Sequence, residues 1–202
     1  MKYGLVILLF FTFLNAVKGQ FGQNHAIYLA PEMSLGNYFG IDAGLNYVYK
    51  EKYSFQIGAS GHLRVPKSQP EDYSRGMVTV FTFGLHGPFD QMETYKVAFG
   101  RVYTLNEKRT IRVNALIGLG YTKLKRAHNW QWTGGFITGN YNWEYQDYHV
   151  VSIIINPKIE FPLTRIYGLN VSPIVQINKR TTYFGVGIGH MLGLLKAKRP
   201  FG

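Results

Sequence analysis

The sequence contains no cysteine, and its 202 residues include only 11 Asp and Glu against 22 Lys and Arg. The missing cysteine excludes disulfides, thiolate metal sites and lipid attachment at a processed cysteine. An excess of positive charge can indicate a nucleic-acid partner, but the basic residues are scattered and no nucleic-acid motif accompanies them. We therefore expect no nucleic-acid binding, and we expect the charge to favour anionic lipid headgroups and lipopolysaccharide phosphates.

The sequence also lacks an apolar run of the roughly 20 residues that a membrane-spanning helix needs. Its N-terminal apolar run, Gly4 to Leu14, is shorter, follows the positive charge of Lys2 and is followed by small residues. These are the three parts of a secretory signal peptide. We predict that residues 1–19 are a signal peptide cleaved before Gln20 and that 20–202 form one exported domain. An N-terminal membrane anchor is the alternative.

In place of a helical period of 3.6 residues, the mature chain alternates apolar and polar residues with a period of two. At 150–161, Ile153 and Ile155 share one face with other apolar residues, and Lys158 and Glu160 share the other. Successive side chains of a strand point to opposite faces, so this run predicts a strand with one apolar and one polar side. The same alternation is found at 25–35, 37–49, 53–65, 76–86, 94–105, 110–124, 168–178 and 181–192. The predicted fold class is all-β.

The apolar faces of these runs are long, close to the roughly 9–11 residues that a tilted strand needs to cross a bilayer. Aromatic residues gather near the ends of the runs, as in the girdles of membrane barrels. These features predict a single antiparallel up-and-down transmembrane β-barrel; a soluble, exported, ligand-carrying β-barrel is the alternative. We expect eight strands, with residues 25–49 as one long bent strand, and ten as the rival count. Pro157 and Pro173 face outward inside strands, which predicts one shared bulge or kink.

The polar faces carry full charges, which in a membrane barrel lie in the lumen. Three acids and four bases occupy inward positions, and we expect them to pair as a lumen polar network: Glu32, Asp42, Arg64, Lys96, Arg112, Lys158 and Glu160. Side chains fill the interior of an eight-stranded barrel, so a wide diffusion pore is not expected. Bare inward positions at Gly185, Gly187 and Gly189 leave room for long side chains from opposite strands. The histidines have no HxH or HxxxH spacing, so we expect no metal and no cofactor.

The longest predicted connection, at about 126–146, is rich in aromatic residues and is expected to be an external loop. Its candidate ligand-binding residues are Trp130, Trp132, Trp143 and Tyr145, because aromatic side chains bind glycans or proteins by stacking and burial. In the alternative interpretation, the two flanking strands extend beyond the bilayer as a paired ribbon, with the aromatics pairing across it.

A catalytic alternative is a lipid- or glycan-modifying barrel enzyme. His62 and Ser60 share an inward face two positions apart, and Glu32, Asp42 or Glu160 could orient the histidine. A base and a nucleophile on one face can come within hydrogen-bond reach. Alternating polar residues are common on a polar face, however, so we expect a structural or surface-interaction role without enzymatic activity.

Three blocks of sequence carry a family resemblance: Asn156–Pro162, Gly118–Thr122 and Tyr183–Gly189. They are similar to blocks in small outer-membrane β-barrel proteins of Bacteroidota-type Gram-negative bacteria. The resemblance implies an outer-membrane location, contact with outer-membrane lipids and lipopolysaccharide, and folding by the barrel-assembly machinery. It implies no defined activity. One departure lies at the end of the chain, where many such barrels have a terminal aromatic residue that the assembly machinery reads, whereas Phe201 is here penultimate after a basic tail.

Overall fold

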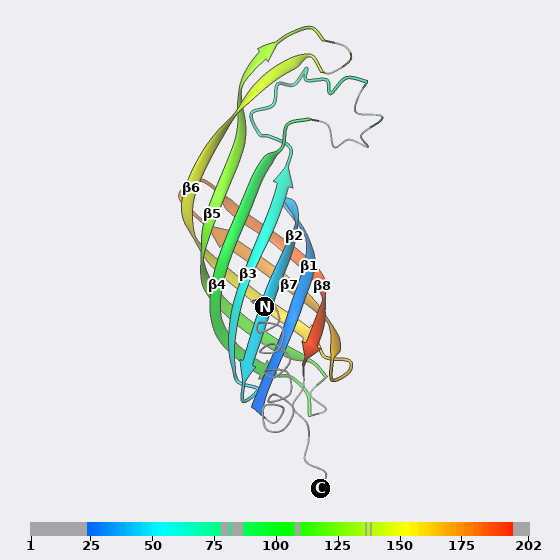
Figure 1. Cartoon of the computed structure of the whole chain (residues 1–202), viewed down its shortest axis with the longest axis vertical. Coiled ribbons are helices and arrows are strands. Elements are labelled where there is room, and N and C mark those ends of the chain that lie inside the picture. Colours follow the sequence, from blue (N-terminus) through cyan, green and yellow to red (C-terminus); the bar gives the residue numbers. More distant parts are fainter. Residues whose placement is uncertain are drawn as a thin grey trace, which may run out of the picture.

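The computed structural model describes residues 24–77, 81, 87–107, 110–135, 137 and 139–195. Its eight strands are β1 (His25–Gly36), β2 (Phe39–Tyr49), β3 (Tyr53–Arg64), β4 (Asp90–Thr104), β5 (Arg112–Trp132), β6 (Tyr141–Phe161), β7 (Tyr167–Ile177) and β8 (Thr182–Leu194). Each strand pairs antiparallel with the next and β8 pairs with β1, so the sheet closes into an up-and-down barrel (Figure 1). Among the described residues, no helix is long and apolar enough to cross a bilayer. The all-β barrel of eight strands is confirmed.

Residues 25–49 form two paired strands, β1 and β2, so the prediction of one long bent strand was wrong. The chain turns after Gly36, where the Cβ of any other residue would collide with the Phe184 carbonyl of β8. Asn37 fixes the turn, because its Nδ2 donates to the Thr182 carbonyl at 2.8 Å and its Oδ1 accepts the Phe184 N–H at 3.1 Å. Apolar and polar residues keep alternating through this short turn, so the sequence pattern does not reveal it.

The surplus run predicted at 76–86 lies mostly outside the described residues. β3 pairs directly with β4 along its whole length, so that run places no strand between them. The connection from β3 to β4 therefore takes up residues 65–89, and the barrel keeps the even strand number that closure of such barrels favours.

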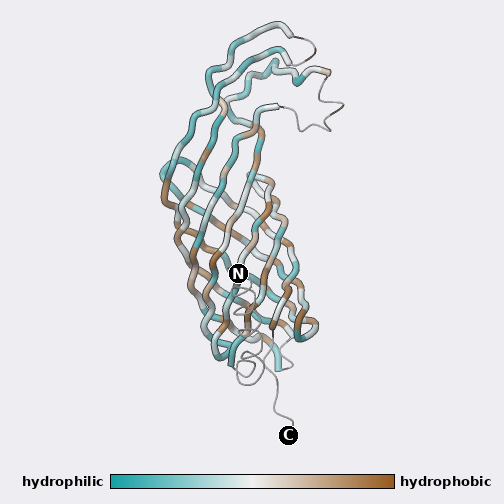
Figure 2. The backbone as a smooth tube through the Cα atoms, in the orientation of Figure 1, coloured by the Kyte–Doolittle hydropathy of each residue, from teal (hydrophilic) through white to brown (hydrophobic). Residues whose placement is uncertain are grey.

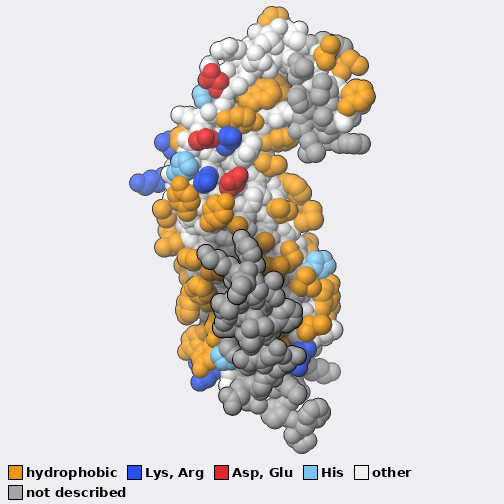
Figure 3. Space-filling view, in the orientation of Figure 1, with side chains coloured by type: hydrophobic (Ala, Val, Ile, Leu, Met, Phe, Trp, Pro, Cys, Tyr) orange, Lys and Arg blue, Asp and Glu red, His pale blue; other side chains and the backbone are white. Residues whose placement is uncertain are grey.

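Side chains alternate between the two faces of the wall. Outward positions carry exposed apolar residues such as Ile41 and Ile117, whereas inward positions carry buried polar residues such as Asn114 and Lys158. Hydropathy alternates along the strands, and apolar side chains cover much of the visible outer wall (Figure 2; Figure 3). Such a surface would drive aggregation in water, whereas in a bilayer it meets lipid.

The ladder between β6 and β7 is interrupted in the middle of the wall. Backbone pairing stops at Ile155 and resumes at Ile159, and the register on both sides places Pro157 opposite Pro173. Neither proline has an N–H to donate. From the lumen side, Asn156 donates its Nδ2 to the Pro173 carbonyl at 2.9 Å. The shared irregularity is confirmed, but because the register is unchanged it is a gap in the ladder and not a bulge.

β5 and β6 continue past the barrel rim as a two-stranded ribbon, which bends over the connection between β3 and β4 (Figure 1). We call residues 126–146 the ribbon; β5 ends in it at Trp132, β6 begins in it at Tyr141, and its register shifts between His128 and Gln131. The expected loop over this range was therefore wrong for most of its length, and the alternative of a paired ribbon is confirmed. The backbone groups pair with each other across the ribbon, which leaves its side chains free to face solvent.

The barrel has two dissimilar ends. β1 begins and β8 ends at one end of the barrel, which we call the terminal end (Figure 1). The short turns at 50–52 and 162–166 lie there too. The ribbon and the described part of the connection between β3 and β4 lie at the other end of the barrel, which we call the ribbon end.

Candidate functional site

All seven predicted charges of the lumen network lie inside the barrel, in four ion pairs. Arg64 pairs with Asp90 at 2.7 Å and Arg112 with Glu160 at 2.5 Å, and the remaining pairs are Lys96–Asp42 and Lys158–Glu32. Asp90, the eighth member, was missed because it opens β4 where the sequence does not yet alternate as a barrel strand does: the inward Met92 is apolar and the outward Glu93 is charged. Four acids and four bases leave this set with no net formal charge, which offsets the cost of burying each charge.

Glu32 connects three strands across a fourth. From β1 its carboxylate accepts hydrogen bonds from Lys158 on β6 and from Asn170 and Ser172 on β7. β8 lies between β7 and β1, and it presents glycine there: a Cβ at Gly187 would come within 2.9 Å of Glu32 Oε2. The bare inward face of β8 thus lets the Glu32 carboxylate of β1 reach across β8 to side chains of β7 and β6.

A second cluster surrounds Glu160 near the terminal end. Its Oε1 accepts hydrogen bonds from the Tyr28 hydroxyl at 2.5 Å and from Asn114 Nδ2 at 3.2 Å, and its Oε2 accepts from Arg112. Arg112 also donates to the Leu195 carbonyl at 3.0 Å, beyond the end of β8. The cluster therefore ties the last described residue of the chain to the lumen of the barrel.

The remaining lumen is filled by uncharged groups. Gln176 Nε2 lies 3.0–3.1 Å from the hydroxyls of Thr94, Thr122 and Ser152, which also bond to one another. Closer to the ribbon end, a buried apolar cluster crosses the barrel: Tyr38, Met92, Leu124, Ile154, Ile174 and Tyr183. Layers of polar and apolar side chains thus succeed one another along the barrel axis.

The predicted catalytic pair is not formed. His62 Nε2 has Ser34 Oγ of β1 as its hydrogen-bond partner, at 3.1 Å, and not the hydroxyl of Ser60. The imidazole ring packs against Tyr183, with 4.4 Å between the two ring centroids. The His62 side chain is 2% exposed, so a substrate has no access to it. In the described part of the chain, no three His, Asp or Glu side chains are gathered in a way that could hold a metal ion.

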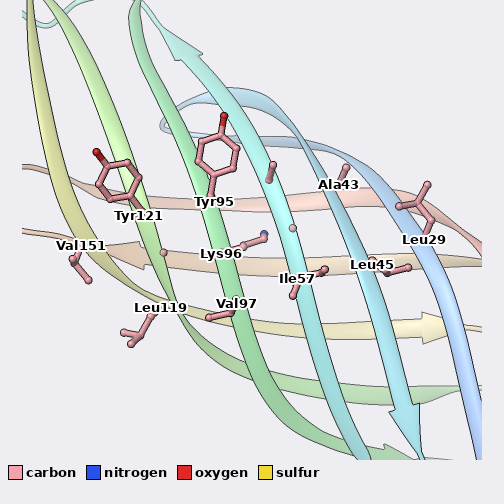
Figure 4. A pocket seen from close by; sticks show the side chains of 13 residues that line it. Leu29, Ala43, Leu45, Ile57, Tyr95, Lys96, Val97, Leu119, Tyr121 and Val151 are labelled. Atoms are coloured by element: carbon pink, nitrogen blue, oxygen red, sulfur yellow. The ribbon is translucent and has the colours of Figure 1, made fainter. Parts of the chain in front are cut away.

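A shallow groove lies on the outer wall. It measures about 700 Å³ and is lined by residues of β1 to β6, Ala43 and Ala59 among them. Figure 4 shows Ala43, Leu45, Tyr95 and Leu119 on this part of the wall. These outward side chains belong to the surface that faces lipid. The groove is therefore a place for acyl chains and not an aqueous ligand pocket.

The four aromatic candidates on the ribbon divide into two groups. Trp130 and Trp143 are half-buried with their ring centroids 5.9 Å apart. Trp132 is 69% exposed near the tip of the ribbon, and Tyr145 is exposed lower down, with the Lys125 ammonium 5.3 Å from its ring centroid. The structure therefore does not bring all four into one site.

Two further aromatic residues complete the cluster around Trp130 and Trp143. The ring centroid of Tyr73, from the connection between β3 and β4, lies 5.4 Å from that of Trp130 and 6.3 Å from that of Trp143. The ring centroids of Tyr141 and Trp130 are 6.4 Å apart. We call these four residues the aromatic cluster. Tyr73 was missed because it lies in a segment without periodicity, and no local pattern reveals docking against a distant ribbon.

Polar contacts fix the connection against the ribbon. The Tyr141 hydroxyl donates to the Asp72 carboxylate at 2.8 Å, which raises the pKa of Tyr141. The backbone N–H of Ser74 donates to Asn140 Oδ1 at 2.7 Å, and Trp130 Nε1 donates to Ser68 Oγ at 3.2 Å. The aromatic cluster is thus held on both sides as a preformed surface.

A closed antiparallel barrel with an apolar exterior and paired charges inside defines a transmembrane β-barrel, because closure leaves no unpaired sheet edge in lipid. No protein-family model and no curated protein sequence matches the chain.

Among solved structures, the chain is similar to Ail, the attachment invasion locus protein of Yersinia pestis, with 12% identity over 85% of this chain and 97% of that chain and a TM-score of 0.48. Neisserial surface protein A is 8% identical over 85% and 96% of the two chains, with a TM-score of 0.46. The N-terminal barrel domain of Pseudomonas aeruginosa OprF is 8% identical over 86% and 99%, with a TM-score of 0.45. Likeness at these identities is one of fold alone.

Proposed function

We propose that the protein is a non-enzymatic barrel of the outer membrane of a Gram-negative bacterium, of the Bacteroidota type, which presents its ribbon to a glycan or protein partner outside the cell. Residues 1–19 direct export as a signal peptide, and the barrel-assembly machinery inserts the mature chain. Outer-membrane lipids and lipopolysaccharide cover the apolar wall.

The orientation follows from the two ends of the barrel. Outer-membrane barrels have short periplasmic turns and longer extracellular segments. The terminal end has the short turns at 50–52 and 162–166, whereas the ribbon end has the two longest connections, the ribbon and the segment between β3 and β4, beside the short turns at 37–38 and 178–181. The terminal end therefore faces the periplasm and the ribbon faces the outside.

One observation carries the proposal: the ribbon extends past the rim and holds a preformed aromatic surface there. Trp132 exposes most of its side chain beside the aromatic cluster, and the connection at 66–77 braces the cluster from below. A rigid aromatic surface loses little entropy on binding, and exposed indole rings stack on sugar rings or bury against protein. The filled lumen, by contrast, supports no transport role.

The test compares the protein with two variants on the surface of a Gram-negative host. In Trp132→Ala the exposed ring is lost, and in Lys179→Gln a polar residue at the same end of the barrel changes as a control. Binding is measured to immobilised neutral, acidic and sulfated polysaccharides and to extracellular matrix proteins. We expect at least one of these probes to bind the unchanged protein at least tenfold more tightly than Trp132→Ala, with Lys179→Gln unaffected.

Equal binding of all three proteins to every probe would refute the ribbon as the binding surface. A parallel measurement tests the filled lumen: in planar bilayers we expect no steady single-channel current, because side chains occupy the interior. A stable current of porin size would overturn the structural assignment of the barrel.

A further inference from the structure

Three cation–tyrosine pairs lie side by side on the outer wall at the terminal end. The cationic group of Lys50 lies 5.2 Å from the Tyr49 ring centroid, that of Lys52 lies 5.4 Å from Tyr53, and that of Arg101 lies 5.4 Å from Tyr103. The register of the sheet makes them neighbours, because Tyr49 faces Tyr53 across β2 and β3 and Tyr53 faces Arg101 across β3 and β4. A compact basic and aromatic patch results.

The cations of this patch have no acidic partner on the strands. Within the described part of the chain, no ion pair involves Lys50, Lys52 or Arg101, and Glu51 lies in the turn between the two lysines. The outward residues at the ribbon end differ, since Glu93 faces Lys123 and Asp147 faces Lys125 across neighbouring strands. Opposite charges face each other across the strands at the ribbon end, whereas at the terminal end three cations, Lys50, Lys52 and Arg101, lie close together with one acid, Glu51, in the turn between the lysines.

An apolar groove begins directly beside the patch. It measures about 420 Å³ and is lined by residues of β3 to β6, with Arg101, Tyr53 and Tyr103 at one side and Phe99 and Ile117 among its apolar walls. The groove exists because Ala115 faces Arg101 across the ladder and carries only a methyl group. A positive charge at the side of an apolar groove matches the two parts of a phospholipid, its phosphate and its acyl chain.

The turn that carries the two lysines is conformationally costly. Lys50 and Glu51 have φ angles of 51° and 53°, a region that glycine or asparagine occupies more readily. The Lys52 N–H closes the turn by donating to the Tyr49 carbonyl at 3.0 Å. Backbone strain of this kind persists where the surrounding structure fixes it, and it is a pointer to function. In this protein the strained turn holds Lys50 and Lys52 close together, with Glu51 between them in the chain.

We infer that this patch and groove bind an anionic glycerophospholipid of the periplasmic leaflet. Its phosphate lies against Lys52 and Arg101 with Lys50 nearby, the tyrosine rings lie at headgroup level, and one acyl chain lies along the groove beside Phe99. Rings of this kind favour the membrane interface, and cations next to it attract anionic lipid. The site goes beyond the proposed surface role, and it uses the proposed orientation only to name the leaflet.

Native mass spectrometry of the full-length mature barrel tests the site. The protein is released from detergent in the presence of equal amounts of phosphatidylglycerol and phosphatidylethanolamine with the same acyl chains. We expect the barrel to retain one phosphatidylglycerol molecule, with a bound fraction at least ten times that of phosphatidylethanolamine. The double variant Lys52→Gln with Arg101→Gln should lose this preference, whereas the matched pair Lys123→Gln with Lys125→Gln, from the ribbon end, should keep it.

Equal retention of the two lipids by the unchanged protein would overturn the inference, as would a double variant that keeps the preference. Loss of the preference in both double variants would also overturn it, because net charge and not this site would then be responsible. The groove has its own variant, Ala115→Leu, which should weaken phosphatidylglycerol retention without changing the charge; unchanged retention would remove the groove from the site. None of these outcomes depends on whether the ribbon binds a partner.

Discussion

The hairpins β5–β6 and β7–β8 lie next to each other in the same wall, yet different interactions hold them. β5 and β6 share an unbroken ladder from Arg112↔Glu160 up to the ribbon. β7 meets β6 across the two-proline gap, and β8 meets β1 across a second gap, at Ala30 and Pro31. β7 and β8 also share an unbroken ladder with each other. Their hairpin, however, is bordered by a gap on both sides, whereas the β5–β6 hairpin has a gap on its β6 side only.

Side chains in the lumen compensate for the missing backbone hydrogen bonds on both sides of the β7–β8 hairpin. Glu32 reaches past the glycines of β8 to Asn170 and Ser172 of β7, and its ion pair with Lys158 anchors the same carboxylate to β6. Buried side chains thus span the places where the ladder is open. β5 and β6 pair with each other without interruption up to His128, where their ladder has already passed into the ribbon.

The largest effect should come from Glu32→Ala. This change leaves the Lys158 ammonium buried without its partner and removes the acceptor for two β7 side chains, so the free energy of unfolding should fall by about 3–5 kcal/mol. Urea titration of the barrel in lipid vesicles measures the change, and hydrogen exchange should show the amides of β7 and β8 opening first. Glu93→Ala, on the outer wall, serves as the control and should change stability by under about 1 kcal/mol. Similar losses in the two variants would contradict the role of Glu32 as a clamp.

The next effect should come from closing the gap between β6 and β7. Valine at both Pro157 and Pro173 restores two backbone N–H groups opposite each other, so the double variant should gain about 1–3 kcal/mol, at 0.5–1.5 kcal/mol for each hydrogen bond. Each single variant should gain less than half of this, because one restored donor leaves the other position open. Urea unfolding of all four proteins gives the coupling energy; a double variant no more stable than the native barrel would show that the gap costs nothing.

A local effect is expected at the ribbon. Trp143→Ala removes one ring of the aromatic cluster and should loosen the connection at 66–77, because Tyr73 then loses a packing partner. Limited proteolysis should cut this connection several times faster, while the unfolding free energy of the barrel stays within about 0.5 kcal/mol. Were the whole barrel destabilised instead, the ribbon would be part of the barrel core and not an independent extension of it.

The smallest effect concerns pH. The hydrogen bond to Asp72 raises the pKa of Tyr141 above its usual value of 10.0. The contact therefore favours docking fully below about pH 10, and its contribution is lost as the pH rises through the raised pKa. Proteolysis of the connection, followed between pH 8 and 11 with an alkali-tolerant protease, should accelerate at the upper end. Tyr141→Phe should show no such step; a step that survives in this variant would assign it to another group.

The sequence predicts which side chains face out of the barrel and which face into it better than it predicts the contacts between them. Lipid outside and polar groups inside impose a period of two, so the faces of Ile153 and Lys158 can be assigned from parity alone. The turn at Gly36 escapes this reasoning because the alternation continues through it. The pairing of charges escapes it as well: Glu32 meets Lys158 only because the barrel closes, and their separation in sequence carries no signal. Asp90 and Tyr73 lie in segments without periodicity, where only the folded chain reveals their partners.

The outer wall of β5 should face lipid between the ribbon and the terminal end, because the barrel spans the membrane. The absence of cysteine makes this directly measurable. Single cysteines replace the outward residues Ala115, Leu119, Tyr121, Lys125 and Trp132, one per variant, and carry a nitroxide label in vesicles.

Collision of these labels with oxygen, which concentrates in lipid, and with a water-soluble nickel complex is then measured by electron paramagnetic resonance. We predict that oxygen access is highest and nickel access lowest at Leu119, and that nickel access rises through Lys125 to a maximum at Trp132. Equal nickel access at Leu119 and Trp132 would contradict the transmembrane barrel.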